Sequence, residues 1–454
     1  MDLQNMKVIV LGAARSGVAS AKVLKKVSAD VVVTDSAAPE AIARDIAELE
    51  AIQVPVVAGG HPFDMFDRGC DLIVKNPGIP PRIPFLQEAR RRNIPIISEV
   101  ELAYMVNKGH IVAITASNGK TTTTTLLGEI LKLDRPDVRV AGNIGIPLTL
   151  EAADCSEDTW LVVEMSSFQL NDIQDFRPEV AAVLNIMPAH IDWHGDFEAY
   201  LEAKTNVLRN QQSTDTAVLN ADNIYTAAMA SVTKAHVLMF SRQHPVDEGA
   251  FVENGHIIVR YKGQQHDVIA VKDLGMGYAH NVENVMAATL MAFAVGASLE
   301  AIREALRTFP GLPHRFQVVS RKNGRIFIND SKATNPGASE IAITLPDGPI
   351  VLLAGGLERN IDLLPFAEHI VKYCHGVVLI GQTTSRLETA FKLLGFTNYQ
   401  CATSMDDAVP RAYALSNPGD TVLLSTGCAS WDMYDDYTTR GFDFMAQIEK
   451  IPEA

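Results

Sequence analysis

The chain has 454 residues, of which 47% are hydrophobic and 20% are charged, and its formal net charge is −15. This composition predicts a globular protein with sizeable hydrophobic cores, and the length suggests about three domains. The negative charge argues against nucleic acid or an anionic membrane as the main partner, because both bind to basic surfaces.

The first hundred residues alternate short apolar runs with polar stretches that are long enough for helices. The apolar runs are rich in β-branched residues and lie at 7–11, 31–34, 54–57, 72–74 and 94–97. Strands that are separated by crossover helices form parallel, doubly wound sheets. We therefore expect a Rossmann-like N-terminal domain over residues 1–107.

The turn after the first expected strand, Gly12-Ala-Ala-Arg-Ser-Gly17, is similar to a dinucleotide-binding turn but departs from it at one position. A Rossmann turn has the pattern G-x-G-x-x-G, and its middle glycine allows the backbone to approach a pyrophosphate. Here that position is Ala14, while Asp35 ends the second strand near the usual place of a ribose-binding acid. The turn is either a nucleotide-phosphate site or a tight turn without a ligand.

A second α/β block begins at Ile111 and forms the expected central domain, residues 108–312. Its strands are expected at 111–115, 138–141, 160–163, 180–184 and 217–219, followed by a hairpin of 255–260 with 266–271. Helical patterns follow at 281–295 and 299–308. The segment Phe-Pro-Gly-Leu-Pro at 309–313 is expected to break the last helix and to act as a linker.

The third block, residues 313–454, has expected strands at 325–328, 350–353, 376–380 and 421–424 and ends in a helical tail. Three α/β domains in series are thus predicted. Five scattered cysteines without CxxC spacing favour reduced thiols. There is no secretion signal, and no apolar run approaches the roughly 18 residues of a membrane span. We expect a cytoplasmic monomer without membrane insertion.

The strongest motif follows the first strand of the central block and has the order strand, small-residue loop, Gly-Lys-Thr and helix. This order is typical of a P-loop, in which backbone N–H groups and the helix N-terminus cradle phosphates. Lys120 would reach the terminal phosphates, and Thr121 could ligate Mg²⁺. The loop is shorter than the usual form, and the alternative is a helix N-cap that contains a lysine. The expected phosphate-binding residues are Ala116, Ser117, Asn118, Gly119, Lys120, Thr121 and Thr122.

Two further segments carry candidate ligands of a metal or phosphate. Glu164 follows an apolar strand in the same block, where a carboxylate could bind Mg²⁺, although a strand-end surface residue is the alternative. His190 and His194 lie four residues apart, but a zinc site is not expected, because there is no nearby cysteine and no expected helix to align them. We interpret His194 as a surface histidine and expect a phosphate or metal role for His190.

Together, these motifs resemble the Mur ligase family, and the resemblance covers essentially the whole chain. It is carried by the P-loop, Asn143 in Ala-Gly-Asn-Ile-Gly, Glu164-Met-Ser-Ser-Phe-Gln-Leu, His190-Ile-Asp with Lys204, His280-Asn281-Val-Glu-Asn284, Gly311-Leu-Pro-His-Arg315-Phe, Asn329-Asp-Ser-Lys-Ala-Thr-Asn335 and Ser430-Trp-Asp432. The Ser-Ser-Phe-Gln-Leu and Asn-Asp-Ser-Lys-Ala-Thr-Asn elements are similar to the D-glutamate-adding branch of the family. Such enzymes add D-glutamate to UDP-N-acetylmuramoyl-L-alanine through an ATP-derived acyl phosphate.

The resemblance also implies roles for individual residues. Lys120 would stabilise the transferring phosphoryl group, and two Mg²⁺ ions would be held by Thr121 with Glu164 and by His190 with Lys204. Other matches to ATP contacts are Asn284, Arg315 and Asp330. The UDP substrate would contact Ala14, Arg15, Ser16, Asp35 and Asn143, and D-glutamate would contact Lys332, Thr334, Ser430 and Tyr437.

Two positions depart from the family pattern or match it loosely. The residue before His190 is often aspartate in the family and is Ala189 here, and the match of Tyr437 to an aromatic position is loose. Lys204 raises a separate physical question, because an ammonium beside two Mg²⁺ ions would be strongly repelled. The family's answer is a carbamylated lysine, whereas the sequence alone also fits a solvated lysine on a helix at 197–208.

Alternative functions remain open from the sequence. A different Mur-type ligase would use another amino acid, and a folylpolyglutamate synthetase would lack a comparable N-terminal domain. An NAD-dependent oxidoreductase would explain the first turn but not Gly119-Lys120-Thr121, and Ala14 disfavours it. A non-catalytic nucleotide-binding protein would not need Lys120, Glu164, His190 and Lys204 together.

Overall fold

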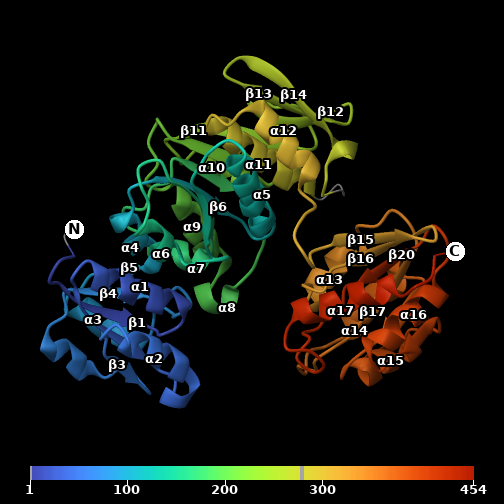
Figure 1. The fold of residues 1–454 in the computed structure, drawn as a ribbon, viewed down its shortest axis with the longest axis horizontal. Helices are drawn as coiled ribbons and strands as arrows, with labels where there is room; N and C mark the ends of the chain where they lie inside the picture. Colours follow the sequence, from blue (N-terminus) through green and yellow to red (C-terminus); the bar gives the residue numbers. More distant parts are fainter. Residues whose placement is uncertain (1–2, 277–280, 454) are drawn as a thin grey trace. The chain divides into compact units, whose positions relative to one another are not determined.

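The computed structural model describes residues 3–276 and 281–453, and the chain divides into two compact units (Figure 1). Of the described residues, 3–276 and 281–309 belong to the first unit and 310–453 to the second. His280, which belongs to one of the family motifs, lies outside the described residues. No helix in the described ranges is long and apolar enough to cross a membrane, and none of the five cysteines there forms a disulfide.

The N-terminal part of the first unit is a five-stranded parallel sheet in the order β3-β2-β1-β4-β5. Its strands are β1 (Lys7–Leu11), β2 (Asp30–Asp35), β3 (Val56–Ala58), β4 (Leu72–Lys75) and β5 (Ile96–Ser98). The helices are α1 (Arg15–Lys26), η1 (Pro39–Ile42), α2 (Ala43–Glu50), η2 (Phe63–Arg68), α3 (Pro84–Arg91) and α4 (Glu99–Val106). The predicted Rossmann-like sheet is confirmed. β3 and β5 begin two residues later than expected, directly after Pro55 and Pro95, because proline has no N–H for the sheet ladder.

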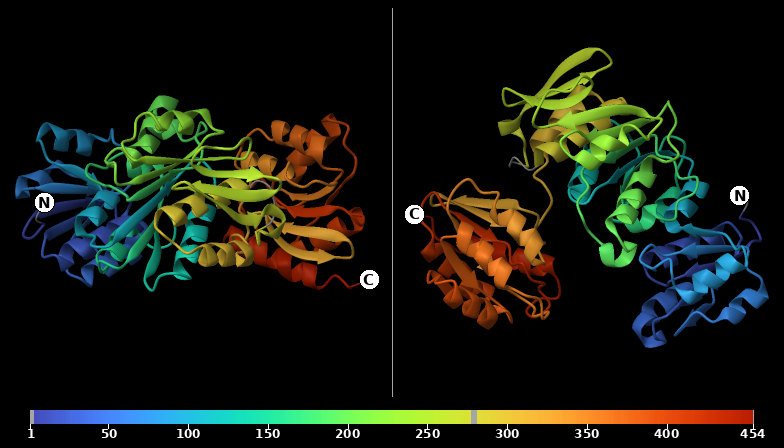
Figure 2. Two further views of the ribbon diagram at one scale, coloured as in Figure 1. Left: turned by 90° about the horizontal axis from the view of Figure 1, so that it is seen from above. Right: turned by 180° about the vertical axis from the view of Figure 1, so that it is seen from behind.

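The middle part of the first unit is a nine-stranded sheet in the order β14-β13-β12-β11-β10-β9-β6-β8-β7. Its strands are β6 (His110–Thr115), β7 (Val138–Gly142), β8 (Trp160–Met165), β9 (Val180–Val183), β10 (Thr216–Asn220), β11 (His236–Ser241), β12 (Gly249–Glu253), β13 (His256–Tyr261) and β14 (Gln264–Ala270). All pairs from β7 to β12 are parallel, and β12–β13 and β13–β14 are antiparallel. The hairpin lies at the end of the middle domain that faces away from the N-terminal sheet (Figure 2).

Helices cover both faces of the middle sheet, and α5 and α11 pack against each other. The helices are α5 (Lys120–Lys132), α6 (Leu148–Ala152), α7 (Ser167–Leu170), α8 (Ile191–His194), α9 (Phe197–Thr205), η3 (Asn206–Leu208), α10 (Ile224–Met229), η4 (Val271–Asp273), α11 (Val282–Ala294) and α12 (Leu299–Thr308). The expected hairpin and the helices at 281–295 and 299–308 are confirmed within a few residues.

The second unit is a six-stranded sheet in the order β15-β16-β20-β17-β18-β19. Its strands are β15 (Gln317–Lys322), β16 (Arg325–Asn329), β17 (Ile350–Ala354), β18 (Gly376–Leu379), β19 (Tyr399–Cys401) and β20 (Thr421–Leu424). Only the β15–β16 pair is antiparallel. The helices are α13 (Pro336–Ile343), α14 (Leu364–Tyr373), α15 (Thr384–Leu393), α16 (Met405–Leu415) and α17 (Tyr437–Glu449). The four strands expected in this unit are confirmed, and β15 and β19 are additional.

Buried polar contacts join the N-terminal and middle domains within the first unit. Glu99, at the start of α4, accepts the backbone N–H of Thr149 on α6 at 2.7 Å, and burial raises the pKa of its carboxyl. Glu101 accepts three backbone N–H groups, those of residues 174, 175 and 176, at 2.7, 2.7 and 3.1 Å. Both carboxylates are almost fully buried. These contacts fix the N-terminal sheet against the middle domain.

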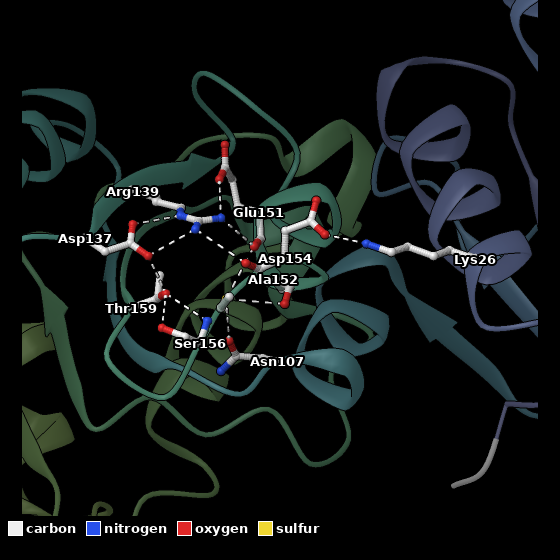
Figure 3. Close-up of polar contacts among 10 residues, drawn as sticks. Lys26, Asn107, Asp137, Arg139, Glu151, Ala152, Asp154, Ser156 and Thr159 are labelled. Atoms are coloured by element: carbon white, nitrogen blue, oxygen red, sulfur yellow. Dashed lines mark hydrogen bonds and ion pairs between the residues drawn. The ribbon is translucent and has the colours of Figure 1, made fainter.

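A second polar network lies at the outer edge of the middle sheet (Figure 3). Arg139 on β7 binds both carboxylate oxygens of Asp137 at 3.0 Å and contacts the carbonyl and carboxylate of Glu151 at 3.4 Å. An ion pair between Lys26 on α1 and Asp154 ties the N-terminal domain to the same region. The network holds α6 and the following loop against β7.

Candidate active site

The loop after β6 has the backbone geometry of a phosphate-binding turn. Gly119 has φ +87°, a left-handed conformation that favours glycine, and α5 begins at the next residue. A Cβ atom at Gly119 would lie 2.2 Å from the Asn284 side chain, which approaches the loop from α11. Asn284 also accepts a hydrogen bond from Thr123 at 3.3 Å. The structure therefore brings the expected P-loop and Asn284 together.

The segment that follows β9 braces this loop. Asn185 accepts the backbone N–H of Ser117 on its carbonyl and that of Asn118 on its side chain, both at 2.9 Å. The Ser117 hydroxyl lies 2.8 Å from the Tyr200 hydroxyl and donates to the carbonyl of Met187 at 3.0 Å. Sequence reasoning missed Asn185 and Tyr200. The first could have been found as a polar side chain that directly follows a buried strand.

Lys120 folds back over its own loop. Its ammonium donates to the carbonyls of Ala116 at 2.8 Å and of Ser117 at 3.0 Å. Thr121 and Thr122 follow in the first turn of α5, where the backbone N–H groups of a helix have no partner within the helix. The loop can therefore offer phosphate oxygens a cation, hydroxyls and backbone donors in a few consecutive residues.

Glu164 is buried, so the alternative of a strand-end surface residue is wrong. Its side chain is 1% exposed, and one carboxylate oxygen accepts a hydrogen bond from the Asn143 amide at 2.7 Å. Its other oxygen is buried and has no hydrogen-bond partner among the described residues. An unsatisfied buried carboxylate oxygen is costly, and it is the donor type that Mg²⁺ prefers.

Lys204 is 2% exposed, so the alternative of a solvated lysine is wrong. Its amine donates to the Thr115 hydroxyl at 2.9 Å and to the Ala116 carbonyl at 2.8 Å. Burial, followed by the charge of Lys120, lowers the pKa of Lys204 well below its usual range, and Glu164 opposes the shift. The side chain thus lies directly beneath the loop that carries Lys120.

His190 and His194 differ from what their spacing predicted. An unexpected short helix, α8, spans Ile191–His194, so that His190 directly precedes it, with φ +55°, and His194 is its last residue. His194 is 6% exposed and lies 3.0 Å from the Ser167 hydroxyl, so the prediction of a surface histidine is wrong. Burial, then the charges of Lys204 and Lys120, lowers the pKa of His190. Ala189 packs against the apolar core of the middle domain.

The residues expected to hold two Mg²⁺ ions come from four elements of the middle domain. Thr121 is on α5, Glu164 is on β8, His190 precedes α8 and Lys204 is on α9. No group of three or more His, Cys, Asp or Glu side chains is placed to hold a metal within residues 3–276 and 281–453. A metal site here would therefore need donors of other kinds, such as a hydroxyl, phosphate oxygens or a carbamate.

A cavity of about 840 Å³ lies between the N-terminal and middle domains of the first unit. All five residues expected to contact the UDP substrate line it: Ala14, Arg15, Ser16, Asp35 and Asn143. Sequence reasoning missed other lining residues, among them His61, Asn76, Phe168 and Gln169. The side chains of Asn76, Asn143 and Gln169 offer both donors and acceptors.

Two of these expected contacts also hold the cavity wall in shape. The two carboxylate oxygens of Asp35 accept the backbone N–H groups of Ala13 at 2.7 Å and of Ala37 at 2.8 Å. The guanidinium of Arg15 donates to the carbonyl of Gly145 in the middle domain. Asp35 therefore braces the turn after β1, and Arg15 joins that turn to the middle domain.

The second unit carries the remaining expected residues. Asp330 accepts the backbone N–H of Phe316 at 3.0 Å and the Ser425 hydroxyl at 2.8 Å, and burial raises the pKa of its carboxyl to about 7. Arg315 lies two residues before β15. Arg315 and Asp330 both belong to the second unit.

The residues expected to contact D-glutamate gather on loops of the second unit. The Lys332 ammonium lies 3.9 Å from the centre of the Tyr437 ring, so the loose match of Tyr437 places it beside another expected residue. The Ser430 hydroxyl is buried without a hydrogen-bond partner in the described part of the chain. Thr334 follows Lys332 by two residues and is partly exposed.

A buried guanidinium that sequence reasoning missed connects two of these loops. Arg440 on α17 donates to the hydroxyl and the carbonyl of Ser331 at 2.9 and 2.8 Å and to the carbonyl of Cys428 at 3.1 Å. Burial lowers its pKa to about 10. Because it is held by three hydrogen bonds, Arg440 fixes the segments that precede Lys332 and Ser430.

Comparisons with known proteins cover the whole length of the chain. Residues 6–98 match the MurD-like N-terminal domain of Mur ligases, 114–292 the Mur ligase middle domain and 314–428 the glutamate ligase domain. The UDP-N-acetylmuramoylalanine–D-glutamate ligase of Geobacillus kaustophilus strain HTA426 is 43% identical and covers 99% of this chain and 98% of its own. The relative of the same name from Bacillus mycoides strain KBAB4 is 41% identical, with 99% of each chain covered.

A solved structure, MurF from Acinetobacter baumannii, has the same fold. Its TM-score is 0.61 at 18% sequence identity, and the match covers 98% of this chain and 94% of that chain. The three domains in series and the resemblance predicted from the motifs are both confirmed. With a P-loop after β6, a cavity between the N-terminal and middle domains and a family match in each of its three parts, the chain belongs to the Mur ligase family.

Proposed function

We propose that the chain adds D-glutamate to UDP-N-acetylmuramoyl-L-alanine with ATP, giving ADP and phosphate, in the synthesis of peptidoglycan precursors. The observation that carries the proposal is the hydrogen bond from Asn143 to Glu164, at 2.7 Å. Asn143 lines the substrate cavity, and Glu164 lies on β8 of the ATP-binding domain with its second carboxylate oxygen unsatisfied among the described residues. This contact connects a residue of the cavity wall with a candidate Mg²⁺ ligand of the P-loop domain. The names of the relatives specify the same substrate and amino acid.

The UDP part of the substrate is assigned to the turn after β1. Ala14, Arg15 and Ser16 offer the diphosphate the N-terminus of α1 and a guanidinium, and Asp35 closes the turn. Asn143 contacts the substrate from the middle domain. ATP is assigned to residues 116–122 and Asn284, with Arg315 and Asp330 of the second unit as further ATP contacts.

The residues of the middle domain fit two Mg²⁺ ions. The unsatisfied oxygen of Glu164 and the hydroxyl of Thr121 would hold one, and His190 and Lys204 would hold the other. When bound, the ions would neutralise the negative charge of the ATP phosphates. A carbamate on Lys204 would supply the anionic oxygens that an amine lacks, and burial lowers the pKa of the lysine, which favours the neutral amine that reacts with carbon dioxide.

In the reaction, the carboxylate of the alanyl substrate attacks the terminal phosphorus of ATP, and ADP leaves. Lys120 stabilises the charge of the phosphoryl group during this transfer. The amine of D-glutamate then attacks the acyl phosphate through a tetrahedral intermediate and loses a proton, and the C–O bond breaks to release phosphate. The contacts of the P-loop with Asn284 on α11 and with Asn185 after β9 hold the loop in place for this transfer.

D-Glutamate is assigned to Lys332, Thr334, Ser430 and Tyr437. The ammonium of Lys332 and the unpartnered hydroxyl of Ser430 suit a carboxylate, and the Tyr437 ring fixes Lys332 by a cation–π contact. We place the domain boundaries at 1–107, 108–312 and 313–454. We further propose that the enzyme acts as a cytoplasmic monomer on small-molecule substrates.

The proposal is tested by phosphate release from ATP with UDP-N-acetylmuramoyl-L-alanine and a panel of amino acids. Release that depends on D-glutamate is the expected result. Release with a different amino acid would identify another Mur-type ligase. Absence of turnover with every amino acid would contradict the proposed reaction.

A further inference from the structure

His61 is the one histidine among the residues that line the substrate cavity. It follows β3 by three residues, on the same edge of the sheet as the turn after β1 and as Asp35. Neither the P-loop nor the proposed reaction uses it. It lies beside Phe85, with the ring centres 5.6 Å apart, so the imidazole is packed against the wall of the cavity.

The hydrogen bonds of Thr34 determine which nitrogen of His61 carries the proton. The Thr34 hydroxyl is buried and donates its one proton to the carbonyl of Gly60 at 2.9 Å. The same oxygen lies 3.0 Å from Nδ1 of His61. Because the hydroxyl proton is already donated, Nδ1 must be the donor in this second contact. In the neutral imidazole, Nε2 is then an acceptor.

The neutral form of the ring is favoured at this position. Burial lowers the pKa of His61, and the charge of Asp35 opposes the shift without reversing it. His61 lines the cavity, and its Nε2 is therefore a hydrogen-bond acceptor whose identity the Thr34 contact fixes.

The order of the strands indicates which part of the substrate lies near His61. The sheet order is β3-β2-β1-β4-β5, and the middle domain contacts α1, α4 and the end of β4. The end of the substrate that reacts must point to the middle domain, where Asn143 and the P-loop lie. With the diphosphate at the turn after β1, the nucleoside extends to the opposite side, toward β2 and β3. That side carries Asp35 and His61.

We propose that His61 is a specificity-determining residue that accepts the N3–H of uracil at Nε2. This inference rests on the proposed UDP substrate. Uracil has a donor at N3, whereas cytosine has an acceptor there, so cytosine would face Nε2 with two lone pairs opposed. A methyl group on N3 would remove the same hydrogen bond. Thr34 is a positioning residue, because its acceptor oxygen keeps the proton on Nδ1.

The test is calorimetric titration of the whole protein with UDP, CDP and 3-methyl-UDP. We expect the wild type to bind UDP about ten-fold more tightly than either analogue, since a pocket with a fixed acceptor rejects a base without the matching donor. His61→Phe keeps an aromatic ring but should weaken UDP about ten-fold and remove the preference. Thr34→Val removes the hydrogen bond that keeps the proton on Nδ1 of His61. It should therefore reduce the preference for UDP over the two analogues, and it should weaken UDP binding less than His61→Phe does.

Two further variants make the result decisive. His256→Phe changes a histidine on the distant hairpin, where it pairs with Asp267, and should leave all three affinities unchanged. If His61→Phe fails to fold, His61→Gln takes its place. The glutamine amide can both donate and accept a hydrogen bond, so this variant should bind UDP and CDP with equal affinity. Retention of the wild-type preference in a folded His61 variant would overturn this inference and leave the ligase assignment intact. Failure of the wild type to bind UDP at all would overturn both.

Discussion

The ammonium of Lys75 lies 2.8 Å from a carboxylate oxygen of Asp172, and this ion pair joins the N-terminal sheet to the middle domain. Lys75 ends β4 and is fully buried, and it also donates to the carbonyl of Ile79 at 2.9 Å. Ile79 lines the substrate cavity, and Asp172 follows α7, whose Phe168 lines the cavity from the other side. The buried ammonium of Lys75 thus holds the two sides of the substrate cavity together.

We therefore expect Lys75→Met to weaken both the fold and substrate binding. Removing one partner of a buried ion pair leaves an uncompensated charge and destabilises by about 3–5 kcal/mol. Thermal unfolding should show the loss, and KM for the UDP substrate should rise more than kcat falls. The double variant Lys75→Met/Asp172→Asn should recover part of the stability, because it removes the unpaired carboxylate. An unchanged unfolding temperature in Lys75→Met would show that the pair is unimportant.

Lys120→Ala should abolish ligation and leave binding of the UDP substrate nearly intact. The ammonium lies on the P-loop, whereas the cavity residues assigned to UDP lie mainly on the N-terminal domain. Loss of a positioned charge at a transferring group lowers kcat by about 10²–10³. Lys132→Ala, at the other end of α5, is the matched control and should be fully active. A loss of UDP-substrate affinity in Lys120→Ala as severe as the loss of activity would contradict the assignment.

Lys204→Ala should lose most activity, and added acetate should restore part of it, if the lysine acts as a carbamate. Acetate can occupy the place of the missing anionic oxygens. Lys204→Arg should be equally inactive, because a guanidinium keeps its charge and does not take up carbon dioxide. Acetate should not rescue Lys120→Ala, which serves as the control. Near-normal turnover by Lys204→Arg would exclude the carbamate.

Asp330→Asn should make the stability of the second unit less dependent on pH. Burial raises the pKa of the Asp330 carboxyl to about 7 from an ordinary value of 3.8, so the folded state holds a proton that the unfolded state releases in this window. The stability contributed by the protonated form is therefore present below about pH 4 and is lost as the pH rises toward 7. The loss is on the order of a few kcal/mol.

The measurement is chemical denaturation of the wild type and the variant at pH 5 and pH 8. The free energy of unfolding of the variant minus that of the wild type should be more positive at pH 8 than at pH 5. Asp435→Asn, a change at an exposed position of the segment before α17, should follow the wild type at both values. Identical pH profiles for the wild type and Asp330→Asn would show that Asp330 is ionised in the folded state throughout.

The sequence predicts those parts of the site that consecutive residues form. The P-loop is one example, because strand, loop, lysine and helix follow one another without a gap. Lys204 and His194 could not be placed in this way. Each lies on a short helix, and its burial arises from packing against residues far away in sequence, such as Thr115 for Lys204 and Ser167 for His194.

The strands that the sequence did not predict have physical reasons of their own. β11 reads His-Val-Leu-Met-Phe-Ser, and such an apolar run fits a helix as well as a strand. β12 begins at Gly249, which has φ +140° and approaches β11 so closely that a Cβ atom would lie 1.7 Å from the Met239 carbonyl. β15 and β19 are outer strands with partly exposed side chains, so they lack the apolar signature of buried strands.

The Arg139 network has a consequence for the behaviour of the protein at high concentration. β7 is an outer strand of the nine-stranded sheet, and an unpaired outer strand can recruit a second chain and start aggregation. Here Ala141 forms a bridge with Ile146, and Arg139 holds α6 and its loop over the same edge. At the opposite edge, β14 begins Gln264-Gln-His-Asp267, a polar run that is a poor template for further strands. Both edge strands of the nine-stranded sheet, β7 and β14, are therefore poor sites for pairing with a second chain.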